Sequence, residues 1–210
     1  MTFIFIPVVN IFSPTHENQN GNNRNVSQLA ATTNSVILKQ LDLYTLSQYL
    51  NNTISNLMVI ADASMNGSNS FGNIPLINVT SEMKTKYHGI PSDQDLEKRN
   101  EAKQLLGANK ALLHVGLLLP NGDRYFGEPY SPYQTNSSTT NFAYRDHFIG
   151  AVETNQPYLS NTINTVTTGE TFAILASPIY SDTKNHTSLI GVQVLGLNFT
   201  YFNDLIISQC

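Results

Sequence analysis

The sequence predicts an α+β fold in which a five-stranded antiparallel sheet is flanked by helices and preceded by a long N-terminal helix. Three observations predict it. Apolar residues recur with helical spacing over residues 26–63, Asn121-Gly122 supplies a strong hairpin turn after an apolar run, and three further β-rich runs follow residue 157. This order of elements favours helices packed against one antiparallel sheet.

Composition restricts the classes of partner and site. The 210 residues have room for one core-bearing domain and a long accessory element, or for two very small domains. Charged residues make up only 12% of the chain, about half the usual share, and the net charge is -4. Without a Lys/Arg cluster, we expect no nucleic-acid partner. The single cysteine, Cys210, provides no disulfide framework, and no His or acid spacing predicts a metal site or a cofactor.

The first 24 residues are expected to be a leader and linker. The run Phe3 to Phe12 is apolar but too short to span a bilayer, and Pro7 and Asn10 interrupt it. It is the trimmed end of a transmembrane helix, an N-terminal strand or a disordered leader. The sparsely charged surface and seven Asn-x-Ser/Thr sequons favour an extracytoplasmic location. The sequon residues are Asn25, Asn51, Asn66, Asn78, Asn136, Asn185 and Asn198.

Residues 25–65 predict one long helix. Val36, Leu43, Leu50 and Leu57 form an apolar stripe, and neither Pro nor Gly interrupts the segment before Gly67. A helix of this length cannot bury all of that stripe against one small domain. We expect the surplus to pack on a partner helix or to lead to a membrane; a merely long surface helix is the alternative.

The middle of the chain predicts a helix and a hairpin. Residues 71–91 contain Pro and Gly and are expected to form a loop. Residues 92–95 resemble a capping box for a helix from Leu96 to Gly107. The run 111–119 is expected to be a strand buried on both faces, and residues 124–127 return as the second strand after the Asn-Gly turn.

The second half completes the sheet. After a loop over residues 128–140, a short helix is expected over 144–153, and three strands over 158–166, 172–179 and 189–199. Five antiparallel strands with helices inserted after the second strand make an α+β sandwich of the PAS type. Residues 66–210 are therefore expected to form one domain.

The segment Tyr144-Arg145-Asp146-His147-Phe148 is the main candidate for a ligand-facing wall. The planar guanidinium of Arg145 suits a carboxylate, so a small anion is the expected ligand, and a salt bridge to Asp146 is the alternative. Tyr144 and Phe148 lie four residues apart and are expected on one helical face, where one of them packs in the core. His147 either donates to a ligand or has a structural role.

Further pocket walls are expected from the strands. The candidates are Tyr125, Tyr158, Ser160, Ser177 and Tyr180, and each has core packing as an equal alternative. His114 lies within an apolar strand and is expected to be a hydrogen-bonded core histidine. No catalytic residue is assigned, because the chain contains neither a G-x-S-x-G elbow nor a phosphate-binding glycine loop.

Several segments together carry a family resemblance. Asn121-Gly122, YRDHFIGA, PYLS, the TG before an apolar strand ending in SPIY, and LIGVQVLGLNF resemble a Cache domain over roughly residues 92–207. Cache domains are extracytoplasmic PAS-like sensors of histidine kinases and chemoreceptors. The resemblance implies a small-molecule ligand, a homodimer through the long N-terminal helix and a connection to the membrane through further segments.

The resemblance also restricts the ligand. Amino-acid-binding members have an upstream Tyr, then Arg, Trp and Tyr, and an Asp on the last strand. Arg145 matches the Arg, whereas His147 and Phe148 stand at the Trp and Tyr, Thr140 at the upstream Tyr and Gly196 at the Asp. An α-amino acid is therefore not expected. The alternative to a sensor is an extracellular structural or adhesion module with a vestigial pocket, and a secreted hydrolase is a third, weaker hypothesis.

Overall fold

The computed structural model describes residues 22–72, 76–130, 140–164, 171–182 and 188–207. The predicted leader run 3–12 and Cys210 lie outside these residues. The elements are α1 (Asn22–Met65), the 3-10 turn η1 (Ser70–Gly72), α2 (Ser81–Tyr87), α3 (Leu96–Ala108), β1 (Leu112–Leu118), β2 (Arg124–Glu128), α4 (Asp146–Thr154), β3 (Tyr158–Leu159), β4 (Ile163–Asn164), β5 (Thr171–Phe172), β6 (Ile174–Tyr180), β7 (Leu189–Leu197) and α5 (Phe199–Ile207).

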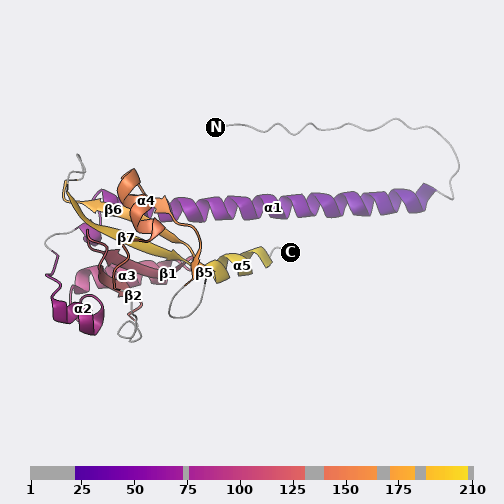
Figure 1. Ribbon diagram of the computed structural model, residues 1–210. Helices are drawn as coiled ribbons and strands as arrows, with labels where there is room; N and C mark the ends of the chain where they lie inside the picture. The colour runs from indigo at the N-terminus through magenta and orange to yellow at the C-terminus, as the bar shows by residue number, and fades with distance from the viewer. Residues whose placement is uncertain (1–21, 73–75, 131–139, 165–170, 183–187, 208–210) are drawn as a thin grey trace. The chain divides into compact units, whose positions relative to one another are not determined.

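The predicted five-stranded antiparallel sheet is confirmed. Its order is β2-β1-β7-β6-β3, and every neighbouring pair is antiparallel. The last strand, β7, is central because it pairs with both β1 and β6 (Figure 1). The single strand expected over 158–166 is instead two short ones, β3 in the main sheet and β4 paired with β5.

The two faces of the sheet have separate cores. One face, called the α3 face, includes Leu117 and Phe126 and packs with residues of α1, η1 and α3. The other, called the α4 face, includes Leu118 and Val194 and packs beneath Phe148 of α4. Successive strand residues point to opposite faces, so β1, β6 and β7 contribute to both cores.

A register shift in the first hairpin decides which side chains of β2 reach each face. Leu117 pairs with Phe126, but the next residue, Leu118, pairs with Arg124, which leaves Tyr125 as the extra residue of a β-bulge. Cross-strand partners lie on the same face of a sheet. Arg124 therefore shares the α4 face with Leu118, whereas strict alternation would place it beside Phe126.

The long helix α1 belongs to two compact units, residues 1–44 and 45–210. In the second unit, Leu57 and Ala61 are buried in the α3-face core. The Ser64 hydroxyl donates to the Gln193 side-chain oxygen at 2.6 Å, and the Ser177 hydroxyl donates to the Ala61 carbonyl at 2.9 Å. No helix in the described part of the chain is long and apolar enough to cross a bilayer.

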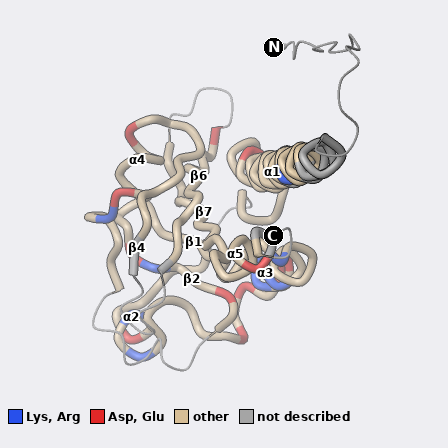
Figure 2. The backbone as a smooth tube through the Cα atoms, turned by 90° about the vertical axis from the view of Figure 1, so that its right-hand side faces the viewer, with Lys and Arg blue, Asp and Glu red and all other residues tan. Residues whose placement is uncertain are grey.

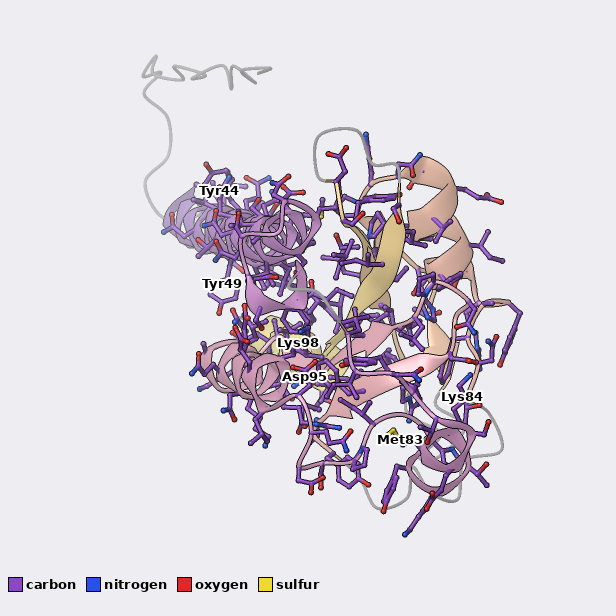
Figure 3. The ribbon with its side chains drawn as sticks, turned by 90° about the vertical axis from the view of Figure 1, so that its left-hand side faces the viewer. Tyr44, Tyr49, Met83, Lys84, Asp95 and Lys98 are labelled. Atoms are coloured by element: carbon purple, nitrogen blue, oxygen red, sulfur yellow. The ribbon has the colours of Figure 1, made fainter. Side chains whose placement is uncertain are left out.

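Two predicted local structures were wrong. The loop expected over 71–91 contains α2, which carries Met83 and Lys84 (Figure 3). Its Thr80 cap accepts from the Met83 amide at 3.2 Å, and its seven residues are too few for a clear periodic signal. The capping box at residues 92–95 does not form. Asp95 precedes α3 with φ +47° and caps no amide; its carboxylate instead accepts from Tyr125 at 2.8 Å and pairs with Lys98 at 3.2 Å.

The start of the long helix and the end of the last strand differ slightly from the expected bounds. Residues 22–24, expected in the linker, begin α1, and the last strand ends at Leu197 because Phe199 starts α5. The aromatic residues of α5 pack against the α3-face core, and Tyr201 contacts Tyr49 of α1 through their hydroxyl groups. The sequence alone does not show where β7 ends and α5 begins, because β-branched and aromatic residues are mixed throughout this apolar run.

Asp123 ties the hairpin turn to two other segments and provides a pH test. Its carboxylate accepts from Lys84 at 2.6 Å, from Asn141 at 2.9 Å and from Asn121 at 2.9 Å. Burial raises the pKa of Asp123, but these hydrogen bonds outweigh burial and leave the pKa below its ordinary value. Such a carboxyl group stabilises the fold above its unfolded pKa and loses that contribution as pH falls through the folded pKa.

Asp123→Asn is therefore expected to lower Tm by a few degrees at pH 7, and the gap to wild type should narrow as pH falls below about 4. Thermal unfolding followed by circular dichroism from pH 7 to pH 2 measures it. Asp93→Asn, at an exposed position, is the matched control and should follow wild type. Parallel curves for wild type and Asp123→Asn would contradict the prediction.

Candidate functional site

The α4 face brings several predicted site residues together. Phe148 and Ala151 of α4 are buried against Val192 and Val194 of β7. Gly150 allows this approach, because a Cβ there would lie 2.5 Å from ring atoms of Tyr158. Tyr158 packs against the same core. The helix, the central strand and β3 thus meet over one surface, the location expected for the pocket.

The start of α4 differs from the expectation. The helix begins at Asp146, so Tyr144 precedes it and is 60% exposed, whereas Phe148 is 7% exposed. The prediction that Tyr144 and Phe148 share a helical face was therefore wrong. The Arg145 guanidinium lies 5.1 Å from the centre of the Tyr144 ring.

Asp146 pairs with the backbone in preference to Arg145. One of its side-chain oxygens accepts from the His147 amide at 2.8 Å, and the other accepts from the Asn161 amide at 2.8 Å. It thus joins the first turn of α4 to the segment after β3. No ion pair between Arg145 and a carboxylate is found among the described residues.

His147 is a buried neutral histidine. It is 3% exposed, and its Nδ1 atom has no hydrogen-bond partner among the described residues. Burial lowers the pKa of His147 to about 4; Asp146 opposes this shift and Arg145 adds to it. At neutral pH His147 therefore offers a neutral imidazole and no positive charge.

Ser160 and Tyr180 lie at two edges of the α4 face. The Ser160 hydroxyl accepts from the Ile174 amide at 2.9 Å and donates to the Asn161 carbonyl at 2.7 Å. The Tyr180 hydroxyl donates to the side-chain oxygen of Asn155, the residue that ends α4. Both side chains hold α4 and β3 in place.

Two of the predicted residues are on the α3 face. Tyr125 is the bulge residue, and its hydroxyl donates to Asp95 at 2.8 Å and accepts from the Ile77 amide at 3.0 Å. Ser177 donates to the Ala61 carbonyl of α1. The structure therefore does not bring these two hydroxyl groups to the surface beneath α4.

Arg124 and His114 are on the α4 face, and we did not single out Arg124 from the sequence. The Arg124 guanidinium lies 5.1 Å from the centre of the Phe142 ring, and burial lowers the pKa of Arg124. Burial lowers the pKa of His114 to about 4, the charge of Arg124 adds to the shift, and a hydrogen bond to the Glu128 backbone opposes it.

One sequence signal could have identified Arg124: the predicted strands contain very few charged residues. Arg124 and Glu128 are the only Asp, Glu, Lys or Arg residues in the five strands of the main sheet. Figure 2 shows charged residues gathered along α3, with few on the strands. Glu128 pairs with Arg99 of α3 at 2.6 Å, so Arg124 is the only such charge on the α4 face of these strands.

A shallow depression of about 650 Å³ lies elsewhere, between the end of α1 and α3. Its lining is polar or glycine and includes residues 67–70, Glu97, Asn100, Glu101 and Gln104. It shares no lining residue with the α4 face. Among the described residues, no group of three or more His, Cys, Asp or Glu side chains could hold a metal ion.

Comparison with known proteins identifies the fold. No family model matches the chain, and no curated protein matches it in sequence. The sensory domain of the Campylobacter jejuni chemoreceptor Tlp3, with isoleucine bound, has a TM-score of 0.57 and 16% identity over 84% of this chain and 65% of that one.

Two further solved structures agree. The extracellular domain of rpHK1S-Z16, described as a histidine kinase, has a TM-score of 0.59 and 13% identity over 86% of this chain and 64% of its own. The ligand-binding domain of the Pseudomonas aeruginosa PAO1 amino-acid chemoreceptor PctC, in complex with GABA, has a TM-score of 0.52 and 11% identity over 80% and 62%. The chain spans less than two thirds of each domain, and it has the fold of these chemoreceptor and histidine-kinase sensory domains.

Proposed function

We propose that the chain is the extracytoplasmic ligand-sensing domain of a membrane-bound signal-transduction receptor, of the chemoreceptor or histidine-kinase type. The shared fold supports this proposal, since Tlp3 and PctC are ligand-binding domains of chemoreceptors. In this proposal residues 25–65 are the signalling helix and residues 66–210 the sensor domain. Catalysis is not required, and an output domain would be a separate part of the receptor.

The observation that carries the proposal is that the same two strands, β6 and β7, contact α4 on one face of the sheet and α1 on the other. On β6, Ala176 packs in the α4-face core and Ser177 binds α1. On β7, Val194 packs in that core and Gln193 accepts from Ser64 of α1. A ligand that favours one arrangement of the α4 face would therefore bias the position of α1.

The proposed ligand site lies between the sheet and the segment that leads into α4. It includes Tyr144, Arg145, His147, Phe148, Tyr158, Ser160 and Tyr180. Arg145 stands at the N-terminal end of α4, where the helix dipole also favours negative charge. A small anionic molecule is the ligand class that this arrangement suits.

A thermal-shift screen of the whole chain tests the proposal. Organic acids, amines, nucleobases and sugars are each added in excess, and at least one class is expected to raise Tm, because a ligand at 100 times its Kd stabilises by about 2.7 kcal/mol. Arg145→Ala should then weaken a bound anion about tenfold or more. Failure of every compound to change Tm would favour the adhesion-module alternative, and unchanged anion affinity in Arg145→Ala would rule out the role of Arg145.

We also propose that the chain forms a homodimer through α1. Leu29, Val36 and Leu43 recur every seven residues and are 69%, 50% and 65% exposed. In the sequence they continue the seven-residue spacing of Leu50 and Leu57. A second copy of the helix would cover this stripe with the seven-residue repeat typical of helix pairs.

The double variant Val36→Asp/Leu43→Asp is expected to weaken the dimer at least tenfold, since it places four charges in the seam. Sedimentation equilibrium measures the dimer dissociation constant. Asn34→Asp adds a charge on the opposite side of the helix and is the matched control. A wild-type chain that stays monomeric at high concentration, or a double variant with unchanged association, would contradict the dimer.

A further inference from the structure

We propose that Arg124 and His114 form an acid-recognition subsite on the α4 face, and that it takes small organic acids that lack an ammonium group. The subsite deepens the proposed sensor function and rests on it. It differs from Arg145 because it lies on the sheet itself, on the opposite side of the proposed ligand from the start of α4.

The first argument is the placement of a positive charge without a partner. The β-bulge at Tyr125 turns Arg124 onto the α4 face, where its guanidinium lies over the Phe142 ring. Among the described residues no carboxylate pairs with the guanidinium. The backbone amide of Arg124 donates to the Thr140 carbonyl at 2.8 Å. A desolvated guanidinium without an anion is costly, and a bound carboxylate supplies the planar partner that its fork fits.

The second argument is that the nearby acids are already engaged. Glu128, the other charged residue of β2, points to the α3 face and binds Arg99. Asp123 binds Lys84 and two Asn side chains, and Asp146 accepts from two backbone amides. The net charge presented by the sheet on the α4 face is therefore positive, which attracts a carboxylate and repels an ammonium group.

The third argument is the shape of the surface beside Arg124. Gly116 pairs with Gly127, and His114 pairs with Gly196, so three residues of this face carry no side chain. A Cβ at Gly116 would lie 3.0 Å from Nε2 of His114, and a Cβ at Gly196 would lie 3.0 Å from Cβ of His114. Gly116 and Gly196 thus leave room for the His114 side chain, and Arg124 is near enough for its charge to lower the pKa of His114.

His114 complements Arg124 as a neutral group. At neutral pH His114 carries no charge, because burial and Arg124 hold the pKa of His114 at about 4. The single N–H of the neutral imidazole donates to the Glu128 backbone carbonyl, so the other ring nitrogen can accept a hydrogen bond from a ligand hydroxyl. The pair therefore combines one charged fork with one neutral hydrogen-bonding group, a set that suits a carboxylate with a small apolar or hydroxylated remainder.

The test uses matched acids that differ only in the ammonium group: propionate with alanine, 4-methylpentanoate with leucine, and succinate with aspartate. Calorimetric titration of the whole chain measures each affinity. At least one acid without an ammonium group is expected to bind ten times or more tightly than its amino-acid partner. Arg124→Gln should weaken that acid about 10- to 100-fold while the circular dichroism spectrum stays native.

Two further variants distinguish a ligand role from a structural one. Arg124→Met is expected to leave Tm of the ligand-free protein unchanged or higher, since the guanidinium has no acidic partner to lose. Arg124→Lys keeps the charge but not the fork, and it should bind the acid at least tenfold more weakly than wild type; it replaces Arg124→Gln if that variant does not fold.

Three results would overturn the subsite: equal or tighter binding of the amino acid in every pair, unchanged acid affinity in the Arg124 variants, or no binding of any acid to wild type. Binding of a neutral compound or an amine in the wider screen, without any acid, would overturn the subsite and leave the sensor function standing. Absence of binding by every class would overturn both.

Discussion

Arg99→Met is expected to destabilise the domain by about 3 to 5 kcal/mol, because it leaves the buried carboxylate of Glu128 without its partner. Arg99 is fully buried and donates to Glu128 at 2.6 Å. It also donates to the carbonyls of Ile90 and Pro91 at 2.9 Å each, and to that of Gln94 at 3.0 Å. The Arg99 side chain therefore donates to acceptors in the loop before α3 and at the end of β2, and it links these two segments.

Urea unfolding followed by circular dichroism measures the loss. Lys103→Met, at an exposed position of the same helix, is the matched control and should change stability by less than about 0.5 kcal/mol. The double variant Arg99→Met/Glu128→Met should be more stable than Arg99→Met alone, because no unpaired charge remains buried. A loss below about 1 kcal/mol in Arg99→Met would show that water or another group already compensates Glu128.

Leu57→Ala is expected to cost about 3 kcal/mol, the usual range for a buried leucine replaced by alanine. Leu57 is 2% exposed and is the point at which α1 enters the α3-face core. The change leaves a cavity between the helix and the α3-face core. In the proposed sensor it should also weaken the coupling between ligand binding and α1.

Val59→Ala is the control for Leu57→Ala, since Val59 lies two residues along the same helix and is 66% exposed. It should leave the urea midpoint nearly unchanged. Equal losses in the two variants would mean that the long helix is held by its own helix propensity or by a partner, and that the domain core contributes little to its position.

Much of the fold was predictable because it depends on local patterns. The apolar spacing of residues 26–63 predicted α1, and the Asn-Gly turn predicted the β1–β2 hairpin. The helix α2 and the division of residues 158–166 into two strands were not predicted, since such short elements contain too few residues for a periodic signal. The capping box failed because the Asp95 carboxylate binds Lys98 and Tyr125, and Tyr125 is 30 residues away along the chain.

The candidate site was predictable only in part. Phe148 and Tyr158 pack in the α4-face core, and Ser160 and Tyr180 form hydrogen bonds beside it. Arg145 precedes α4. Tyr125 and Ser177 do not lie on this face, since a bulge and strand alternation turn them to the other face. Whether any of these residues binds a ligand stays a prediction.

The sequence by itself determined the class of the fold, the long helix and the segment that leads into α4, because helical spacing, turn residues and apolar runs are properties of neighbouring residues. Only the tertiary structure decided the face on which each charge lies. One extra residue in β2 moves Arg124 from the side of Glu128 to the side of α4. A β-bulge is set by pairing between strands, so no alternation pattern within β2 could have revealed it.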